Sequence, residues 1–395
     1  MSGWVIKILD EVVEYFIDYR GKTPDKKSSG IPLVTAKIVK DGRLQIPTEF
    51  ISVEDYPLWM TRGYPEINDV VLTTEAPLGE VALLKDKNVA LAQRIITMRG
   101  FEGVLNNKYL KYWFQSDYGQ YELDSRASGT TVFGIKSTVL KKIPIALPSF
   151  REQKAIASVL SSLDDKIDLL HRQNKTLESM AETLFRQWLI EDENGQQVKI
   201  DEIIDFNPRR SIPKNQEAIY LEMSGLSTGN FCATGYYKRQ FSSGTKFINR
   251  DTLLARITPC LENGKAGYIH FLNDDETGWG STEFIIMRPK AEIHPLLAYI
   301  ICRNTEFKEY AESCMEGSTG RQRVNLDHLK EFSLNLPSEI ILHTFNDMLA
   351  SFEVKLINNA EQIQTLEKLR DTLLPKLMSG EVRVQYEPET TASVA

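Results

Sequence analysis

Residues 317–325, GSTGRQRVN, carry the sharpest chemical signal in the sequence. Arg321, Gln322 and Arg323 follow two glycines in a segment that is typical of a loop. Guanidinium groups are costly to bury, but they bind phosphate or the O6 and N7 atoms of guanine through paired hydrogen bonds, and a glutamine amide can read adenine. We therefore predict that this loop contacts nucleic acid. A solvated turn without a partner is the alternative.

Several other segments place basic, hydroxyl or amide side chains beside glycine, proline or aromatic residues. This composition suits loops that approach a phosphate backbone or a base edge. A solvated turn is again the alternative, with equal weight for RGKTPDKK. The candidate contacts are Arg20, Lys22, Thr23, Lys37, Gln93, Arg94, Thr130 and Lys136 in the first half, and Lys238, Arg239, Lys246 and Arg256 in the second.

The sequence carries no motif for catalysis or for a bound cofactor. It has no G-x-G-x-x-G or G-x-x-x-x-G-K-[ST] loop, and NPRR at residues 207–210 lacks the second proline and the aromatic ring of an amino-methyltransferase motif. DDK at residues 164–166 falls on a predicted helix, where a solvated charged face is the simpler interpretation. Four widely spaced cysteines without a C-x-x-C pair favour reduced, buried thiols over zinc or redox chemistry. We expect no catalytic residue, no metal site and no cofactor on this chain.

The net charge of −7 over 395 residues does not exclude nucleic acid, because the charge is unevenly distributed. Residues 151–197 and 337–395 carry −3 and −4, whereas residues 1–150 and 198–336 carry +1 and −1. The two larger blocks can therefore each present a basic face. No basic and apolar leader and no run of 18 apolar residues is present, so we expect a cytoplasmic protein without a membrane span.

An internal repeat organises the chain. LKKIPIALPS at residues 140–149 returns as LKEFSLNLPS at residues 329–338, and Met98 and Met287 stand at the same offset of 189. Each half contains short β-branched runs typical of strands, then segments with helical spacing, then this junction and a long helix. The predicted fold is α+β, with two tandem domains that are each followed by a long helix.

The two long segments after the junctions show heptad spacing, which needs a partner helix. Each seam of ten apolar layers contains one asparagine, Asn174 in the sixth layer of the first and Asn359 in the fifth of the second. A fully overlapped antiparallel pair would bring the two amides together, whereas a parallel pair would leave both buried and unpaired. We predict an antiparallel coiled coil with pseudo-twofold symmetry; two asparagines merely tolerated at the surface of a seam are the alternative. Ser149 and Glu152 form a capping-box pattern at the start of the first long helix. At the start of the second, Ser338 is present but the residue three positions later is Ile341, so only half of the pattern occurs.

The chain resembles the specificity subunit of type I restriction–modification enzymes over residues 5–384. The matching pieces occur in family order: YRGKTPDKKSSGIPLVTAKIVKDG (19–42), LPSFREQKAIASVLSSLDDKI (147–167), ARITPCLENGKAGYI (255–269), GWGSTEFIIMRP (278–289) and KLRDTLLPKLMSGEVRV (368–384). The resemblance implies a non-catalytic subunit that reads a split, asymmetric site in double-stranded DNA, one half per recognition domain. It also implies that the helices set the gap between the half-sites and bind two methyltransferase (modification) subunits. A motor and endonuclease (restriction) subunit joins through the complex, and S-adenosylmethionine, ATP and magnesium belong to these partners.

The resemblance divides the chain into five parts. Residues 1–147 and 195–336 are the two target-recognition domains, residues 148–194 and 337–383 are the central and distal conserved helical regions, and residues 384–395 are a flexible tail. One departure is LPSEIILHTFNDML, which lacks the Glu-Gln pair of Glu152 and Gln153. The competing hypothesis is a coiled-coil scaffold whose end domains bind proteins, and sequence-specific binding to a bipartite duplex would distinguish the two.

Overall fold

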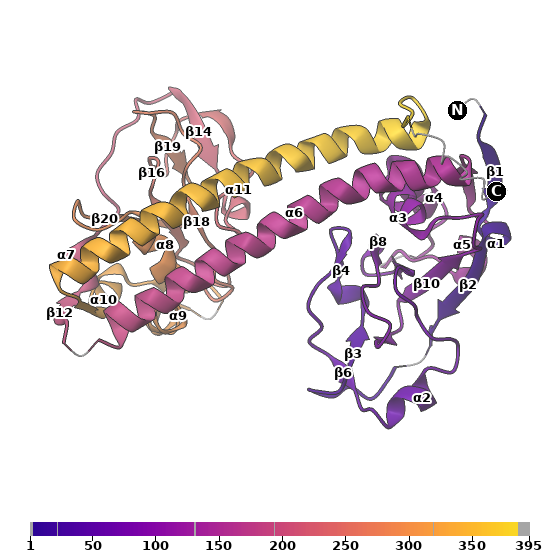
Figure 1. The fold of residues 1–395 in the computed structure, drawn as a ribbon. Helices are drawn as coiled ribbons and strands as arrows, with labels where there is room; N and C mark the ends of the chain where they lie inside the picture. The colour runs from indigo at the N-terminus through magenta and orange to yellow at the C-terminus, as the bar shows by residue number, and fades with distance from the viewer. Residues whose placement is uncertain (1–2, 22, 130–131, 193, 319, 386–395) are drawn as a thin grey trace, which may run out of the picture. The chain divides into compact units, whose positions relative to one another are not determined.

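The computed structural model describes residues 3–21, 23–129, 132–192, 194–318 and 320–385. The chain forms two compact units, Met1–Lys166 with Leu366–Ala395, and Ile167–Thr365. Each unit combines one α+β domain with a stretch of each of the two long helices, α6 (Phe150–Phe185) and α11 (Glu339–Ser379) (Figure 1). None of the described helices has the length and apolar character needed to span a bilayer.

The first unit is built on a four-stranded antiparallel sheet in the order β2-β10-β7-β8. A strand pair, β1 with β11, brings the start of the chain to the strand before α6, and a small sheet of order β6-β3-β9 and the pair β4-β5 complete the unit. The strands are β1 (Val5–Ile8), β2 (Val13–Asp18), β3 (Ile31–Val34), β4 (Val39–Lys40), β5 (Arg43–Leu44), β6 (Phe50–Ile51), β7 (Val70–Thr74), β8 (Leu78–Leu83), β9 (Ala90–Leu91), β10 (Ile95–Gly100) and β11 (Pro144–Leu147). The short helices are α1 (Leu9–Val12), the 3-10 turn η1 (Ala36–Ile38), α2 (Asp55–Trp59), α3 (Asn107–Gln115), α4 (Asp117–Asp124) and α5 (Ser137–Leu140).

The second unit repeats this plan. Its main antiparallel sheet has the order β13-β20-β17-β18, and β12 pairs with β23 as β1 pairs with β11; a sheet of order β15-β14-β19-β16 and the pair β21-β22 are added. The strands are β12 (Gln196–Lys199), β13 (Ile204–Phe206), β14 (Glu217–Leu221), β15 (Tyr237–Gln240), β16 (Thr245–Phe247), β17 (Thr252–Ala255), β18 (Ala266–Tyr268), β19 (Gly278–Gly280), β20 (Phe284–Pro289), β21 (Met315–Glu316), β22 (Arg323–Val324) and β23 (Ser333–Leu336). The short helices are α7 (Ile200–Ile203), the 3-10 turn η3 (Met223–Gly225), α8 (Leu296–Arg303), α9 (Thr305–Ser313) and α10 (Leu326–Leu329).

The structure thus carries the repeat predicted from the sequence. Strands β10 and β20, helices α3 and α8, and strands β11 and β23 each begin 189 residues apart. A buried ion pair is repeated as well: Asp69, 1% exposed, binds Arg99 at 2.8 Å, and Asp251, fully buried, binds Arg288 at 3.1 Å. Duplication therefore extends from the order of elements to individual polar contacts.

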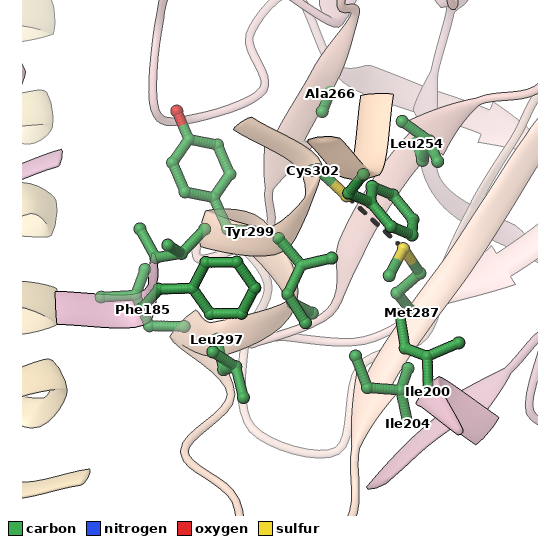
Figure 2. Packing of buried hydrophobic residues seen from close by; sticks show 14 of the residues in the cluster. Phe185, Ile200, Ile204, Leu254, Ala266, Met287, Leu297, Tyr299 and Cys302 are labelled. Atoms are coloured by element: carbon green, nitrogen blue, oxygen red, sulfur yellow. Dashed lines mark hydrogen bonds between the residues drawn. The ribbon is translucent and has the colours of Figure 1, made fainter. Parts of the chain in front are cut away.

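Helix α8 forms the centre of the core of the second unit (Figure 2). Seven of its eight residues are buried, because it lies between the main sheet and the end of α6, where Phe185 packs. Cys302 on this helix lies with its Sγ atom 3.4 Å from the Sδ atom of Met287. Burial raises the pKa of the Cys302 thiol to about 12, so this group stays protonated and acts as a packing residue. All four cysteines are free, and three of them are buried.

The seams of α6 and α11 meet in the register expected of a fully overlapped antiparallel pair. In the second unit Asn359 Nδ2 donates a hydrogen bond to Asn174 Oδ1 at 2.8 Å, and the rings of Trp188 and Phe345 make an edge contact at 5.5 Å between their centroids. Trp188 lies in a π-helical turn, η2 (Arg186–Ile190), that continues α6. In the first unit the opposite ends of the helices meet, with Ile156, Leu160 and Leu377 buried in one cluster. The amide pair satisfies two polar groups that would otherwise be buried without partners.

Each long helix also carries a largely buried carboxylate that its domain holds by hydrogen bonds, and the two carboxylates stand 189 residues apart in the repeat. Asp164 accepts hydrogen bonds from Lys111 Nζ and Tyr112 OH, both at 2.7 Å, and pairs with Arg370. The sequence interpretation of a solvated charged face is therefore wrong for Asp164, whose side chain is only 15% exposed. Burial raises its pKa, but the charge and hydrogen bond of Lys111 outweigh that effect and lower it.

Glu353 on α11 is the corresponding carboxylate of the second unit. It accepts two hydrogen bonds from Arg250, at 3.0 and 2.8 Å, and one from Tyr268 OH, and His294 Nε2 lies 3.4 Å away. Burial raises the pKa of Glu353, but the hydrogen bonds from His294, Arg250 and Tyr268 prevail and hold it at about 2. A charged anchor thus fastens each domain to the helix that follows it.

A side-chain amide clamps the start of each long helix to its domain. Gln153, 1% exposed, accepts from the backbone N–H of Asn106 at 2.9 Å and donates to the carbonyl of Val104 at 3.0 Å. In the second unit Asn346 accepts from the N–H of His294 and donates to the carbonyl of Glu292, both at 2.9 Å. The missing Glu-Gln pair is thus replaced by an amide one turn further along α11.

The helix ends add two details to the sequence expectations. Ser149 caps α6, since its Oγ accepts from the Glu152 N–H at 3.2 Å, while the Glu152 carboxylate lies 3.9 Å from Arg383. Val384, which the sequence places in the tail, packs partly buried against the core of the first unit. The remainder of the expected tail, residues 386–395, lies outside the described residues.

The amide pair leads to a first prediction. Replacing Asn359 with leucine leaves the Asn174 amide buried without its partner and should lower the free energy of unfolding by about 1–3 kcal/mol. The double variant Asn174→Leu/Asn359→Leu should recover most of that loss, because both polar groups are then removed. Urea unfolding of the two variants measures both effects; equal losses in the single and double variants would contradict this account.

The carboxylate anchor leads to a prediction about pH. The pKa of Glu353 is depressed from its ordinary value of 4.5 to about 2, so its contribution is complete above pH 4.5 and disappears as the pH falls toward 2. Glu353→Gln should lower the free energy of unfolding at neutral pH by something on the order of 3 kcal/mol. The difference from the native protein should shrink between pH 4.5 and pH 2, as followed by urea unfolding at several pH values.

The control for this experiment is Glu367→Gln, on the same helix. Among the described residues no ion pair or hydrogen bond involves the Glu367 side chain, so its removal should change stability little at any pH. A constant difference between Glu353→Gln and the native protein across this pH range would contradict the assigned pKa.

Candidate nucleic-acid interface

The first candidate surface is built around a short loop of the first unit. Ser128 and Gly134 exchange backbone hydrogen bonds of 2.9 and 3.1 Å, which close the loop, and the Ile135 N–H donates to the carbonyl of Thr74 at 3.0 Å at the end of β7. Arg20 Nη2 donates to the Ile135 carbonyl at 3.0 Å. Lys136 follows directly and is exposed. The structure therefore brings Arg20 and Lys136, which are 116 residues apart in sequence, to the base of one loop.

Arg94 joins the same region from the residue that precedes β10. Its backbone has a φ of +70°, and its Nε lies 3.0 Å from Glu75 Oε1. Glu75 in turn forms a β-bridge with Gly134 in the loop. The adjacent Gln93 is half-buried. The guanidinium charge of Arg94 is therefore largely compensated inside the protein, which favours a role in ordering the loop.

The other predicted residues of the first unit lie elsewhere or outside the description. Lys37 is on η1, with its side chain 80% exposed and 3.8 Å from Glu49, a carboxylate that also binds Lys26 at 2.8 Å. Thr23 is exposed. Within the described residues no hydrogen bond or ion pair connects Lys37 or Thr23 with the loop. Lys22 and Thr130 lie outside the described residues.

The corresponding loop of the second unit holds the arginine cluster predicted from the sequence. Arg323 binds Glu283 in a paired arrangement, with Nε at 2.9 Å and Nη2 at 2.7 Å from the two carboxylate oxygens. Hydrogen bonding from Arg323 and the charge of Arg256 lower the pKa of Glu283, although burial opposes them, so the carboxylate stays ionised. Gln322 and Thr258 are joined through the Gln322 N–H, which donates to Thr258 Oγ1 at 3.1 Å.

Arg321 differs from its neighbours in this loop because its side chain is exposed and no described hydrogen bond or ion pair engages its guanidinium group. Its backbone N–H donates to the Ser318 carbonyl at 2.9 Å, which fixes the turn. Arg256, by contrast, is half-buried, and its Nε atom is buried without a hydrogen-bond partner among the described residues. Arg321 is therefore the arginine of this loop whose guanidinium group is both exposed and free of described partners.

Lys238, Arg239 and Lys246 lie on a different sheet of the second unit. Lys238 and Arg239 are exposed on β15, and the Arg239 guanidinium lies over the rings of Tyr220 and Trp279, at 4.8 and 5.6 Å from their centroids. Lys246 on β16 lies over the ring of Phe241. The preceding Thr245 donates to the Ser281 carbonyl at 2.9 Å, two residues before Glu283. This sheet therefore reaches the arginine loop at one end. Arg239 is exposed and Lys246 is half-buried, and both lie over aromatic rings.

Sequence reasoning missed the two acidic partners. Arg94 and Glu283 occupy equivalent positions, 189 residues apart. In the first unit this position holds the basic member of an ion pair, with Glu75 as its partner, and in the second unit it holds the acidic member, with Arg323 as its partner. The only feature of the sequence that could have indicated these acidic partners is the opposite charge of Arg94 and Glu283 at equivalent repeat positions.

The sequence is similar to known proteins of one kind, the specificity subunits of type I restriction enzymes. A family model described as the type I restriction modification DNA specificity domain matches residues 1–179. The MjaIX specificity subunit of a type I restriction enzyme from Methanocaldococcus jannaschii is 27% identical over 354 residues, which are 80% of this chain and 78% of that protein. The chain is thus similar to specificity subunits of type I restriction enzymes over four fifths of its length.

One further relative and one solved structure are also similar to this chain. The specificity subunit of the type I restriction enzyme EcoEI from Escherichia coli is 24% identical over 202 residues, 48% of this chain and 33% of that protein. The crystal structure of a type I restriction–modification S subunit from M. genitalium has the same fold, with a TM-score of 0.53 over 95% of this chain and 96% of that chain, at 18% identity. The expected similarity to specificity subunits and the expected α+β fold are therefore confirmed.

Proposed function

We propose that this specificity subunit reads a split, asymmetric site in double-stranded DNA, with the recognition domains at residues 1–147 and 195–336 each binding one half. The observation that carries the proposal is the pair of equivalent loops, each attached to the end of a strand by the same hydrogen bonds. The Ile135 N–H donates to Thr74 in one domain and the Val324 N–H to Arg256 in the other. Since the side chains of the two loops differ, the two half-sites need not match.

The helical regions at residues 148–194 and 337–383 are proposed to bind two methyltransferase (modification) subunits and to set the gap between the half-sites. Both helices present apolar side chains to solvent, among them Leu169, Met180 and Val354, which are 40%, 49% and 58% exposed. Exposed apolar positions on otherwise acidic helices suit a protein partner better than DNA. The motor and endonuclease subunit would then join through the complex, and S-adenosylmethionine, ATP and magnesium would be bound by these partners.

The competing hypothesis is a scaffold whose end domains bind proteins. The two hypotheses differ in how binding to a duplex depends on salt concentration and on the distance between the half-sites. Binding to DNA through phosphate contacts weakens steeply as salt increases, and binding to a bipartite site depends on the distance between its halves. Protein binding has neither property with respect to a duplex. Sequencing of methylated adenines in cells that express this subunit with its methyltransferase would give both half-sites and their spacing.

Arg321 provides the sharpest test of the interface. Arg321→Glu should reduce specific binding by the methyltransferase complex about 10- to 100-fold, the effect of losing one paired contact to a base, while the unfolding curve stays unchanged. Fluorescence anisotropy with a duplex that carries the mapped site measures the loss. Arg323 is less suitable, because reversing its charge would place two carboxylates together at Glu283.

Lys308→Gln on α9 is the control, since Lys308 is a partly exposed cation of the same domain whose ion pair is with Glu312 on its own helix, and a neutral side chain there does not place two carboxylates together. It should leave the affinity for the mapped site within about twofold of the native value. Native-like binding by Arg321→Glu would remove this loop from the DNA interface.

A further inference from the structure

The two candidate loops correspond residue by residue, but their exposed tips have opposite chemistry. At the repeat offset of 189, Val132 corresponds to Arg321 and Phe133 to Gln322. The next residue of each loop forms a β-bridge with the equivalent strand extension, Gly134 with Glu75 and Arg323 with Ile257. The same backbone support therefore presents an apolar pair in the first domain and a hydrogen-bonding pair in the second.

The apolar pair is exposed although the loop is closed at its base. Val132 and Phe133 are 52% and 62% exposed, while Ile135, two residues beyond Phe133, is fully buried. Gly129 has a φ of +143°, and a Cβ atom there would lie 2.0 Å from the Val132 carbonyl oxygen, so only glycine allows this return of the chain. Arg20 and Lys136 supply positive charge at the base of the same loop. An exposed apolar pair in a loop with basic side chains at its base has the chemistry of a contact to bases, with phosphates bound on either side.

We propose that Val132 and Phe133 contact the C5-methyl group of a thymine in the major groove of the half-site read by the first domain. The inference rests on the proposed function. We infer the major groove from the equivalent loop of the second domain, where arginine and glutamine stand at the corresponding positions. These two residue types read purine edges in the major groove. The apolar feature that the major groove offers to a side chain in their place is the thymine methyl. The two half-sites are thus read by different forces, apolar contact in one and hydrogen bonding in the other.

The test replaces single thymines of the mapped site with deoxyuridine, which removes the methyl group and leaves base pairing intact. The complex of this subunit with its methyltransferase is titrated with each duplex, and binding is followed by fluorescence anisotropy. For the native complex, at least one such replacement in one half-site should weaken binding by about fourfold, the factor that corresponds to one buried methyl group. In the variant Phe133→Ala the same replacement should have no further effect, because the methyl group has lost its partner.

Matched variants keep the result specific. Arg321→Ala should bind more weakly but retain the full sensitivity to deoxyuridine, because Arg321 belongs to the other domain. Phe133→Leu, which keeps an apolar tip, should retain most of that sensitivity. In the other half-site, single guanines are replaced with 7-deazaguanine. A loss of binding caused by a contact with Arg321 should occur in the native complex and in Phe133→Ala, but not in Arg321→Ala.

The outcomes separate this inference from the proposed function. Specific binding to the mapped site without any deoxyuridine effect, or with an effect that persists unchanged in Phe133→Ala, would overturn the thymine contact alone. Failure of the complex to prefer the mapped site over a scrambled duplex would overturn the proposed function itself.

Discussion

A polar group that is buried against a helix must be hydrogen-bonded, and four such groups determine how the two long helices are held. Asn174 and Asn359 satisfy each other, and Asp164 and Glu353 are satisfied by the domains that precede them. A shift of one helix by a single heptad would leave the two amides without partners and separate Asp164 from Arg370. Apolar layers alone would tolerate such a shift, so it is the polar groups that select one register.

The duplicated positions have been kept while their partners have changed. Asp164 is bound by Lys111 and Tyr112 from α3, whereas Glu353 is bound by Arg250 and Tyr268 from the main sheet and the loop that precedes it. A buried carboxylate needs cations and hydrogen-bond donors, but it does not specify which elements supply them. The architecture of the repeat is therefore maintained by the helices, and each domain is free to diverge in the side chains that surround the anchor.

The sequence was sufficient for the parts of the structure that depend on periodicity. Residue spacing alone predicts the repeat, the junction before each long helix and the antiparallel register. Each long helix has ten heptad layers and a single asparagine among them, so few alignments bring the two asparagines together. The sequence was not sufficient where the partner is distant or unexpected. Lys111 and Tyr112 are more than 50 residues from Asp164, and nothing local marks them as its ligands. Val132 and Phe133 are residue types that are usually buried, whereas the structure exposes them.

The amide clamps at the helix starts bear on how such a chain can evolve. Gln153 and Asn346 grip equivalent backbone segments from positions one helical turn apart, and the residue equivalent to Gln153 in the second copy is Leu342. A domain moved alone from the first position to the second would present the Val104 carbonyl and the Asn106 N–H to a leucine. The unit that can be exchanged without loss is therefore the domain together with the first two turns of its helix. This makes the interior of the helix, rather than the repeated L-P-S junction, the natural crossover point for reshuffling specificities.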